Sequence, residues 1–450
     1  MGTRRAITAL AAGALVLSSW AVPVPAARAA VPVEELAALC ERLYGDAFGS
    51  PNTEPLGACQ WDMAVIRAGE ASYAHATGAG VTVGVIDSGI QVDHPDIAPN
   101  LDLGRSCSFI AEGTPTAAAE EAADGDCSIK TALTDYDGHG THVASTIAAP
   151  VNGVGIAGVA PEASIVALKA CTAQGYCFAD AVASALRYAG DERLDVVNLS
   201  LYADPYLYFC RSDADQRQVV AEIQAAARYA QQRGVTVVAA AGNSSADLQH
   251  PMADGTSPNW PPGTAIEREV RNHCVQLPTE LPETLTVSAT GPVGYPGYAD
   301  DLAGYSTVGM SRIDVSAPGG EYFAATGTVQ DGVLGATPAS GATWDFFDGF
   351  SDEFPGITTI QGDAGYTYYT GTSMASPHAA GVAALVVQRH PGWSPKAVQA
   401  AVQRTATTLA CPADWVPLDS ADERGRCYGN GGRTSFFGHG MVDALAAATS

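Results

Sequence analysis

Three short segments of this 450-residue chain carry the residue types of nucleophilic catalysis. Asp87 stands in Val-Ile-Asp-Ser-Gly, His139 in Asp-Gly-His-Gly-Thr-His, and Ser373 in Gly-Thr-Ser-Met-Ala-Ser-Pro-His. A serine hydroxyl is a weak nucleophile and needs a base that takes its proton as it attacks a carbonyl carbon. A histidine can be that base, and a buried carboxylate orients its ring and stabilises the imidazolium. The three segments therefore predict a site for acyl transfer made by Asp87, His139 and Ser373.

Alternating strand and helix patterns predict how these residues meet. Continuous apolar runs, typical of a sheet buried on both faces, occupy residues 81–87, 164–170, 196–202, 235–241 and 284–290. Helical patterns occupy residues 139–149, 178–189, 213–232, 372–390 and 394–405. This order predicts an α/β fold in which helices cover both faces of a mainly parallel sheet. In such folds ligands bind beyond the carboxyl ends of the strands, where Asp87 lies.

Composition and the N-terminus limit the function classes. The chain has 23 Lys and Arg against 48 Asp and Glu, a net charge of −25, which argues against a nucleic-acid binder. Residues 1–29 have the positive start, apolar middle and small-residue cleavage site of a signal peptide. No later apolar run is long enough to span a membrane. We therefore expect a secreted, extracellular protein, and nothing in the sequence suggests more than a monomer.

Ten cysteines in an exported chain are expected to be oxidised. Spacing alone leaves many pairings open, and no CxxC spacing suggests a metal site. Because neighbouring cysteines flank irregular or Gly- and Pro-rich segments, which gain most from a cross-link, we expect neighbours to pair. The expected pairs are Cys40 and Cys59, Cys107 and Cys127, Cys171 and Cys177, Cys210 and Cys274, and Cys411 and Cys427.

The residues around these motifs resemble the subtilisin-like (subtilase) serine proteases. The resemblance rests on DSG at Asp87, HGTHVA at His139, AAAGN at Asn243 and GTSMASPHAAG at Ser373, and extends from about Gln60 to the final helix. It implies a subtilisin-like single catalytic domain and an endopeptidase that cleaves protein or peptide substrates without a cofactor. It also implies that Asn243 and the Ser373 N–H donate hydrogen bonds to the oxyanion of the tetrahedral intermediate.

The resemblance further implies that substrate binds as an added strand between residues 175–177 and 200–202. These substrate-binding candidates are Gly175, Tyr176, Ser200, Leu201 and Tyr202. Tyr202 departs from the family, which usually has glycine there, and a tyrosine would crowd or cap the adjacent pocket. Because of this departure, the broad specificity of the digestive members of the family is not expected here. The leading hypothesis is an exported endopeptidase, and a narrower one is a processing peptidase that matures one secreted precursor.

A structural calcium site is a second implication of the resemblance. Asp96 and Asn152 match positions that supply side-chain oxygens to calcium in many subtilases, and oxygen ligands on a loop suit this ion. A helix cap for Asp96 and a turn role for Asn152 are the alternative interpretations.

The expected organisation is a signal peptide at residues 1–29, a short N-terminal extension at 30–59 and the catalytic domain at 60–450. The extension is too short for the inhibitory prodomain of typical secreted subtilases, and whether it is later trimmed stays open. Two stretches look inserted, residues 104–135 and 321–369, and residues 343–354 within the second are either a substrate-contacting flap or a surface loop. The rival function is a binding protein that uses this scaffold without turnover.

Overall fold

The computed structural model describes residues 32–296, 302–338, 357–361, 364–412, 425–430 and 432–450. The predicted signal peptide and the segment 343–354 lie outside the described residues. Within the described part of the chain, no helix combines the length and the apolar composition needed to cross a membrane.

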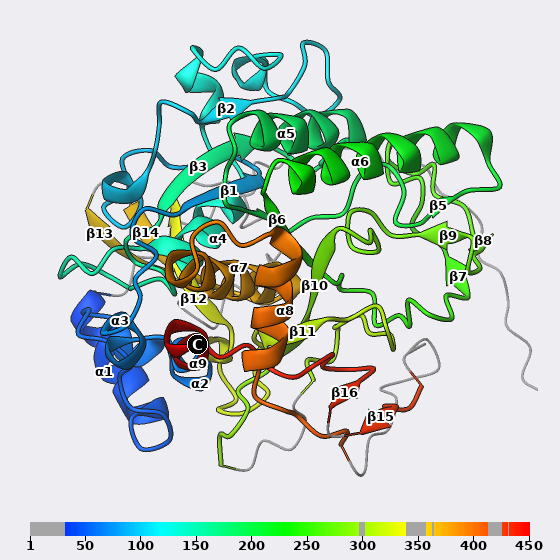
Figure 1. Ribbon diagram of the computed structural model, residues 1–450. Coiled ribbons are helices and arrows are strands. Elements are labelled where there is room, and N and C mark those ends of the chain that lie inside the picture. The colour runs from blue at the N-terminus through cyan, green and yellow to red at the C-terminus, as the bar shows by residue number, and fades with distance from the viewer. Residues whose placement is uncertain (1–31, 297–301, 339–356, 362–363, 413–424, 431) are drawn as a thin grey trace, which may run out of the picture.

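A parallel sheet with the strand order β11-β10-β6-β4-β1-β3-β2 forms the centre (Figure 1). Its strands are β1 (Thr82–Asp87), β2 (Cys107–Ser108), β3 (Ser164–Lys169), β4 (Val196–Leu199), β6 (Thr236–Ala240), β10 (Thr284–Thr290) and β11 (Val315–Pro318). The five predicted strands are confirmed, although β4 ends at Leu199 and not at Tyr202. The Ser200 hydroxyl bonds to the backbone and side chain of α7 (Thr372–Arg389), so the chain leaves the sheet there.

Helices cover both faces of the sheet, as predicted. α5 (Ala179–Asp191) and α6 (Ala214–Gln232) lie on one face, and α4 (His139–Ala148), α7 and α8 (Pro395–Thr405) lie on the other (Figure 1). Local sequence sets where two of them begin. The Asp213 side chain accepts N–H bonds from the first turn of α6, and Ser394 caps α8 directly before Pro395.

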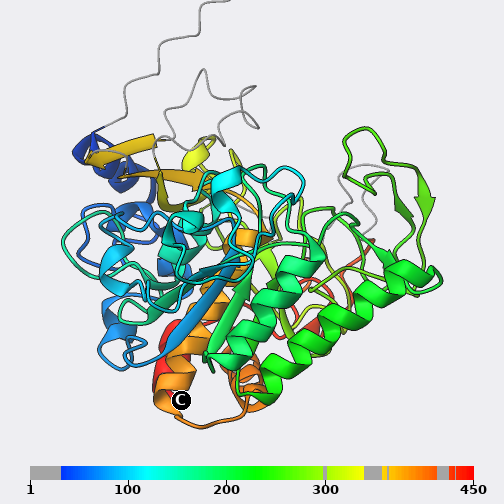
Figure 2. The same ribbon diagram turned by 90° about the horizontal axis from the view of Figure 1, so that it is seen from above.

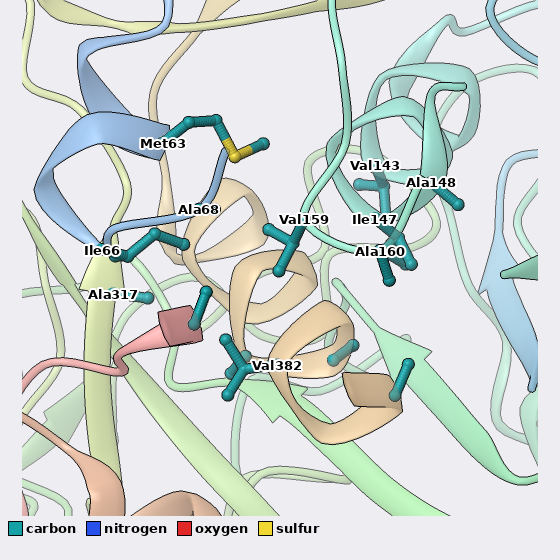
Figure 3. Close-up of a cluster of buried hydrophobic side chains, with 14 of the residues drawn as sticks. Met63, Ile66, Ala68, Val143, Ile147, Ala148, Val159, Ala160, Ala317 and Val382 are labelled. Atoms are coloured by element: carbon teal, nitrogen blue, oxygen red, sulfur yellow. The ribbon is translucent and has the colours of Figure 1, made fainter. Parts of the chain in front are cut away.

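The alternation of side chains along the strands divides the core between the two faces. On β3, Ile165 and Ala167 pack in the cluster under α4 and α7, whereas Val166 and Leu168 pack in the cluster under α5. Figure 3 shows the first cluster, where side chains of α4, α7 and the N-terminal residues Met63 and Ile66 converge. Each fully buried aliphatic side chain contributes about 1.5–3 kcal/mol to folding. The strands that carry the site are therefore held on both faces.

The N-terminal segment, here residues 32–73, packs onto the rest of the chain and shares its core. It forms α1 (Val33–Tyr44), α2 (Trp61–Val65) and α3 (Glu70–Tyr73), and α3 contacts the last helix, α9 (Ala444–Thr449). The Tyr44 hydroxyl donates to Asp331 Oδ1 at 2.8 Å, and the Trp61 indole N–H donates to the Gly332 carbonyl at 2.9 Å. Both aromatic side chains are fully buried, so this segment is integral to the fold.

Two smaller groups of strands flank the sheet on opposite sides (Figures 1 and 2). An antiparallel sheet near the N-terminal helices has the order β12-β14-β13, and short strands near α6 form β5-β9 and β7-β8. The bounds are β12 (Val333–Pro338), β13 (Ile357–Gln361), β14 (Ala364–Tyr369), β5 (Phe209–Cys210), β9 (Cys274–Val275), β7 (Ala253–Asp254) and β8 (Arg268–Glu269), with β15 (Gly429–Asn430) and β16 (Arg433–Thr434) elsewhere. The predicted insertion at 321–369 thus contains β12–β14.

All five expected disulfides are present. One-turn 3₁₀ helices occupy Gly57–Cys59, Ala98–Asn100, Ala119–Glu121, Lys130–Leu133 and Val329–Asp331. The insertion at 104–135 reaches the core through Glu121, which forms a fully buried ion pair with Lys169 at the end of β3, 2.7 Å apart. This insertion is therefore anchored beside the carboxyl ends of the strands.

Candidate active site

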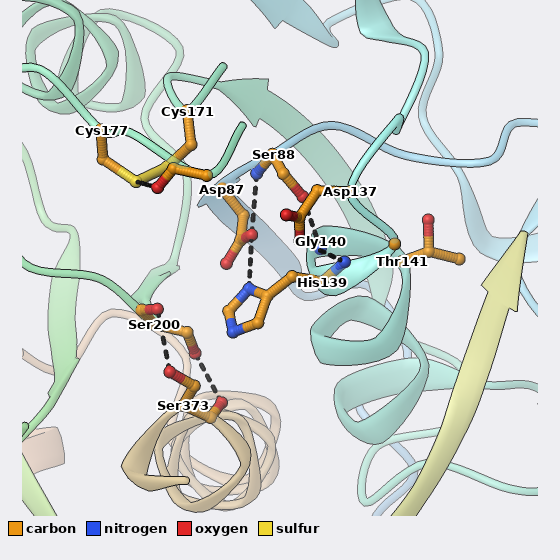
Figure 4. A network of polar contacts seen from close by, with 12 residues as sticks. Asp87, Ser88, Asp137, His139, Gly140, Thr141, Cys171, Cys177, Ser200 and Ser373 are labelled. Carbon is orange, nitrogen blue, oxygen red and sulfur yellow. Dashed lines mark hydrogen bonds and ion pairs between the residues drawn. A yellow bond between two sulfur atoms is a disulfide. The ribbon is translucent and has the colours of Figure 1, made fainter. Parts of the chain in front are cut away.

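Asp87 and His139 form a hydrogen-bonded pair at the carboxyl end of β1. Asp87 is the last residue of β1 and His139 the first of α4, and Asp87 Oδ1 lies 2.7 Å from His139 Nδ1. Because the carboxylate only accepts, Nδ1 carries the proton, and Nε2 is left to act as a base. The Asp87 side chain is 3% exposed and that of His139 is 26% exposed. Figure 4 shows the imidazole between Asp87 and Ser373.

Two residues that sequence analysis missed fix the start of α4. Asp135 Oδ1 accepts from the Gly138 N–H and the Ser88 hydroxyl at 2.8 Å each, and Oδ2 accepts from the Thr141 N–H at 2.9 Å and hydroxyl at 2.6 Å. Ser88 in turn accepts the Gly140 N–H at 2.8 Å. An aspartate shortly before a helix is a cap signal that could have identified Asp135. This network ties His139 to the strand that carries Asp87.

Carboxylates around His139 decide its protonation. Burial disfavours the imidazolium, but the charge and hydrogen bond of Asp87, together with the charges of Asp137 and Asp135, raise the pKa of His139 to about 9. The same charges would stabilise the imidazolium if the ring accepted a proton from Ser373. The site is thus arranged to hold a proton on His139.

Ser373 is the second residue of α7 and faces the same cleft. Its hydroxyl donates to the Ser200 carbonyl at 3.1 Å, and the Ser200 hydroxyl donates to the Ser373 carbonyl at 2.7 Å. No direct hydrogen bond between Ser373 and His139 occurs in the described part of the chain. Catalytic hydrogen bonds often form only when substrate is bound, so the hydroxyl must leave Ser200 before it can donate to the imidazole.

Asn243 lies just beyond β6 with its carboxamide fixed in one orientation. The Thr372 N–H and hydroxyl donate to Asn243 Oδ1 at 2.9 and 2.8 Å. Since the Thr372 N–H can only donate, the amide oxygen must face it, and Nδ2 faces the opposite way. A Cβ added at Gly371 would lie 3.3 Å from Nδ2 and 3.6 Å from the Ser373 nitrogen. Two N–H groups therefore flank one small space that glycine leaves open.

That space suits a negatively charged oxygen. The first N–H groups of a helix lack intrahelical acceptors, and those of Met374 and Ala375 bond to the Gly371 carbonyl. The Ser373 N–H has no acceptor among the described residues, so it is available together with Asn243 Nδ2. The positive end of the α7 dipole adds to the attraction. Both N–H groups can donate to an oxyanion in this space, and the catalytic role of Asn243 stays a prediction.

A cleft of about 720 Å³ brings most of the predicted substrate residues to this site. Gly175, Ser200, Leu201 and Tyr202 line it together with the four candidate catalytic residues. Tyr176 is not among its lining residues, because its ring stacks on Phe178 and meets Trp260 edge-on instead. Several lining residues were not predicted from the sequence, because they are distant in the chain and come together only in the fold. They are Asp137, Asp204, Leu207, Thr256, Gln276 and Thr279.

Tyr202 stands at the rim of the cleft and is 40% exposed. Its hydroxyl accepts a hydrogen bond from Asn259 Nδ2 at 3.1 Å. The same amide donates to Asp204 Oδ1 at 2.5 Å, and the other oxygen of Asp204 accepts the Cys177 N–H. The Tyr202 side chain is thus directed to the loop that carries Asn259.

Asp96 and Asn152 are neighbours, but their contacts do not fit a calcium site. Asp96 Oδ2 accepts from the Tyr366 hydroxyl at 2.6 Å and the Ile156 N–H at 3.0 Å, and Oδ1 accepts from Asn152 Nδ2 at 3.1 Å. The Asn152 oxygen is also used, by the Val154 N–H at 2.8 Å. Burial raises the pKa of Asp96 to about 7. Because protein donors surround these oxygens, the prediction of calcium ligands here is not supported.

One other group of side chains with the atom types of metal ligands occurs in the described part of the chain. Among the described residues, the one cluster of three such side chains is Cys210, His273 and Cys274, and its two cysteines form a disulfide. A disulfide sulfur is no thiolate ligand.

Comparisons with known proteins agree with this geometry. The model of the Subtilase family matches residues 78–440. M-protease of Shouchella clausii is 29% identical over 86% of this chain and 69% of that protein, and Subtilisin BL of Lederbergia lenta is 28% identical over 86% of this chain and 97% of that protein.

Solved structures share the fold. The epidermin leader peptide processing protease EpiP of Staphylococcus aureus superposes with a TM-score of 0.62 at 22% identity, covering 88% of this chain and 81% of that chain. A protease of Pseudoalteromonas arctica superposes with a TM-score of 0.61 at 24% identity, covering 89% of this chain and 99% of that chain. With a family match over most of its length and subtilisins among its relatives, the chain belongs to the subtilase family of serine endopeptidases.

Proposed function

We propose that this chain is a secreted serine endopeptidase that cleaves proteins through an acyl-enzyme on Ser373. The observation that carries the proposal is the convergence of Asp87, His139, Ser373 and Asn243 on one cleft beyond the carboxyl ends of β1 and β6. All four side-chain types that acyl transfer needs are present there, which favours an enzyme over a binding protein on the same scaffold.

The geometry supports a two-stage reaction. Nε2 of His139 takes the Ser373 hydroxyl proton as Oγ attacks the substrate carbonyl carbon, while Asp87 holds the ring and stabilises the imidazolium. Asn243 Nδ2 and the Ser373 N–H donate to the oxyanion. His139 then gives the proton to the leaving amine nitrogen, the C–N bond breaks, and the acyl-enzyme remains. A water molecule, deprotonated by His139, repeats the attack and releases Ser373.

Secretion is supported by two features of the chain. The first 29 residues have the pattern of a signal peptide, and every cysteine of the chain is paired. Stable disulfides form and persist in oxidising compartments outside the cytosol.

Labelling with a fluorophosphonate probe tests the proposal, with mass spectrometry to locate the adduct. We expect the parent protein to be labelled on Ser373 and to digest casein, and Ser373→Ala to lose both properties while keeping its circular dichroism spectrum. Ser184→Ala, which changes an exposed serine on α5, is the matched control and should behave as the parent. Labelling elsewhere, or casein digestion by Ser373→Ala at the parent rate, would refute the assignment.

A processing peptidase of narrow specificity is the second candidate. The observation that favours it is Tyr202, which the Asn259 hydrogen bond holds at the rim of the cleft, at a position where the family resemblance implies glycine. Digestion of a diverse peptide library decides between the two. Cleavage restricted to a few sequences supports the narrow form, and cleavage throughout the library rejects it.

A further inference from the structure

Glu121, which anchors the insertion at 104–135, is fully buried and takes no part in the proposed reaction. Its Oε1 forms the ion pair with Lys169 at 2.7 Å. Its Oε2 accepts two backbone N–H groups, from Ala118 at 2.6 Å within the insertion and from Ala173 at 3.1 Å outside it. One buried carboxylate thus joins three separate segments of the chain.

Ala173 lies in residues 171–177, here called the edge segment. The two ends of this segment, Cys171 and Cys177, form a disulfide and line the cleft (Figure 4). The edge segment includes residues that we expect to pair with substrate. An added strand is bound mainly by hydrogen bonds to the backbone of its neighbour, so substrate affinity depends on where this backbone lies. The contact with Glu121 therefore bears on substrate binding.

The turn in the middle of the edge segment is held by the insertion. Residues 172–175 form this turn, and two of them are exposed. The hydroxyls of Thr116 and Thr172 lie 2.7 Å apart, and the Ala173 bond to Glu121 follows at the next residue. A hydrogen bond to a carboxylate is roughly twice as strong as one between neutral groups. The bond to Glu121 is therefore the stronger of these two attachments.

Lys169 connects Glu121 to the strand that ends in Asp87. The Lys169 ammonium donates to the carbonyls of Ser88 and Thr134, the latter at 2.8 Å. Ser88 directly follows Asp87 in the chain. A buried charge is costly unless it is paired, and Lys169 compensates the charge of Glu121. The ion pair therefore fixes the position of the edge segment relative to the end of β1.

We propose that Glu121 is a positioning residue for substrate binding. Through the Ala173 N–H it holds the edge segment where an extended peptide can pair with it, and the insertion at 104–135 is thus part of the substrate-binding structure. Because Glu121 is fully buried, it acts on the substrate only through the backbone of the edge segment. The proposal rests on the proposed function, because it concerns substrate binding at the same site.

Two rates measured on each protein separate positioning from catalysis. The first is the rate constant for labelling of Ser373 by a fluorophosphonate, a small probe that needs the catalytic residues but not the edge segment. The second is kcat/KM per labelled site for a decapeptide chosen from those that the parent cleaves. Neither rate depends on the fraction of protein that is folded. The ratio of peptide cleavage to labelling therefore falls only when peptide binding is impaired.

Glu121→Ala removes the acceptor of the Ala173 N–H, so the ratio should fall by about 10-fold or more through a higher KM. Glu121→Gln keeps an oxygen for that N–H and removes the charge beside Lys169, so its ratio should lie within about 3-fold of the parent. Glu283→Ala is the matched control. Glu283 is a buried carboxylate that pairs with Arg228 directly before β10, and it is not among the residues that line the cleft. Its loss should leave the ratio unchanged.

Ala173→Pro tests the same bond if Glu121→Ala does not fold. It removes the N–H donor, places a ring carbon against Oε2 and leaves the ion pair with Lys169 intact. Proline is favoured at the second position of a turn, which Ala173 occupies. The ratio should fall as in Glu121→Ala.

An unchanged ratio in Glu121→Ala or in Ala173→Pro would overturn the positioning role. An equal loss in Glu121→Gln would also overturn it, because the charge beside Lys169 and not the bond to Ala173 would then be responsible. If Ser373 of the parent takes no label and no peptide is cut, the proposed function itself fails.

Discussion

The described part of the chain contains an Asp–His pair beside the cleft and another of similar geometry buried between α2 and α7, the helix that carries Ser373. Asp87 and His139 are 2.7 Å apart, and Asp62 and His378 are 2.9 Å apart. His139 is 26% exposed beside the cleft, whereas both side chains of the second pair are 0% exposed. The two Asp–His distances are similar, so the pairs differ mainly in the exposure of the histidine.

The second ring nitrogen makes the difference. His378 Nδ1 donates to the Met374 carbonyl at 2.7 Å, so both of its nitrogens have protein partners. Nε2 of His139 has no protein partner among the described residues and faces the cleft. Asp62 lies on α2 and His378 on α7, so the buried pair joins the N-terminal segment to the helix that carries Ser373. The Asp87–His139 pair leaves one ring nitrogen accessible from the cleft, whereas the Asp62–His378 pair links α2 to α7.

The largest expected effect breaks the first pair. Asp87→Asn should keep the fold but lower kcat by about 10⁴-fold, because an amide no longer holds the ring in the tautomer that leaves Nε2 free. Steady-state hydrolysis of a peptide substrate measures the effect, with circular dichroism as the test of folding. A loss of less than about 10-fold would mean that Asp87 does not orient the base.

The second prediction breaks the buried pair. Asp62→Ala leaves His378 without its partner in a fully buried position, which should lower the free energy of unfolding by about 3–5 kcal/mol. Denaturant unfolding measures this loss. Fluorophosphonate titration gives the concentration of active sites in the protein that remains folded. The kcat per active site should lie within about 3-fold of the parent value. A large loss of kcat per labelled site would contradict the purely structural role assigned to Asp62.

The third prediction concerns pH. Only a neutral His139 accepts the serine proton, so kcat/KM should rise with pH through the pKa of His139. Because Asp87 and its neighbours raise that pKa to about 9 against the opposing effect of burial, this limb should lie above pH 6.5. Asp137→Asn removes one nearby negative charge and should move the limb to lower pH by about one unit.

Asp62→Ala is the control for the pH profile, because Asp62 belongs to the buried pair and should leave the limb in place. A limb at or below pH 6.5 in the parent would show that the carboxylates do not stabilise the imidazolium as inferred.

The smallest expected effect concerns a third buried carboxylate, Asp96, whose partner is a tyrosine. A ligand that binds only the folded state raises Tm. Protein donors surround Asp96, so we expect no calcium ion to bind there. The change in Tm from EDTA to calcium chloride should therefore be the same in the parent and in Asp96→Asn, within about 1 °C. A calcium-dependent rise that the parent shows and Asp96→Asn lacks would restore the calcium assignment.

Local patterns were sufficient to predict five of the seven strands of the central sheet, all but β2 and β11, and the two helices that carry His139 and Ser373. The runs at β1, β3 and β6 are mostly apolar because both of their faces are covered, and this composition is visible without coordinates. β10 instead alternates Thr or Ser with apolar residues, although all seven of its residues are buried. The alternation of these strands with helices leaves few topologies open, so the meeting of Asp87, His139 and Ser373 could be expected. The neighbour pairing of the cysteines was also correct.

Contacts between distant segments could not be predicted in this way. Glu121 was visible within the insertion at 104–135, but its bond to Ala173 depends on a segment 52 residues away. The engagement of Asp96 depends on Tyr366, 270 residues away, and β14 brings that tyrosine to it. His378 likewise stands in a motif that was quoted for Ser373, while its partner Asp62 lies 316 residues before it.

The sequence by itself determined the family, the order of the strands and helices and the types of the candidate catalytic residues, because these follow from periodicity and short motifs. The tertiary structure alone decided which polar atoms face the cleft and which are enclosed by protein hydrogen-bond partners. It left Nε2 of His139 and Nδ2 of Asn243 facing the cleft, and it enclosed Asp96 and His378 with protein partners. Hydrogen-bond satisfaction depends on neighbours from the whole chain, so no local pattern encodes it.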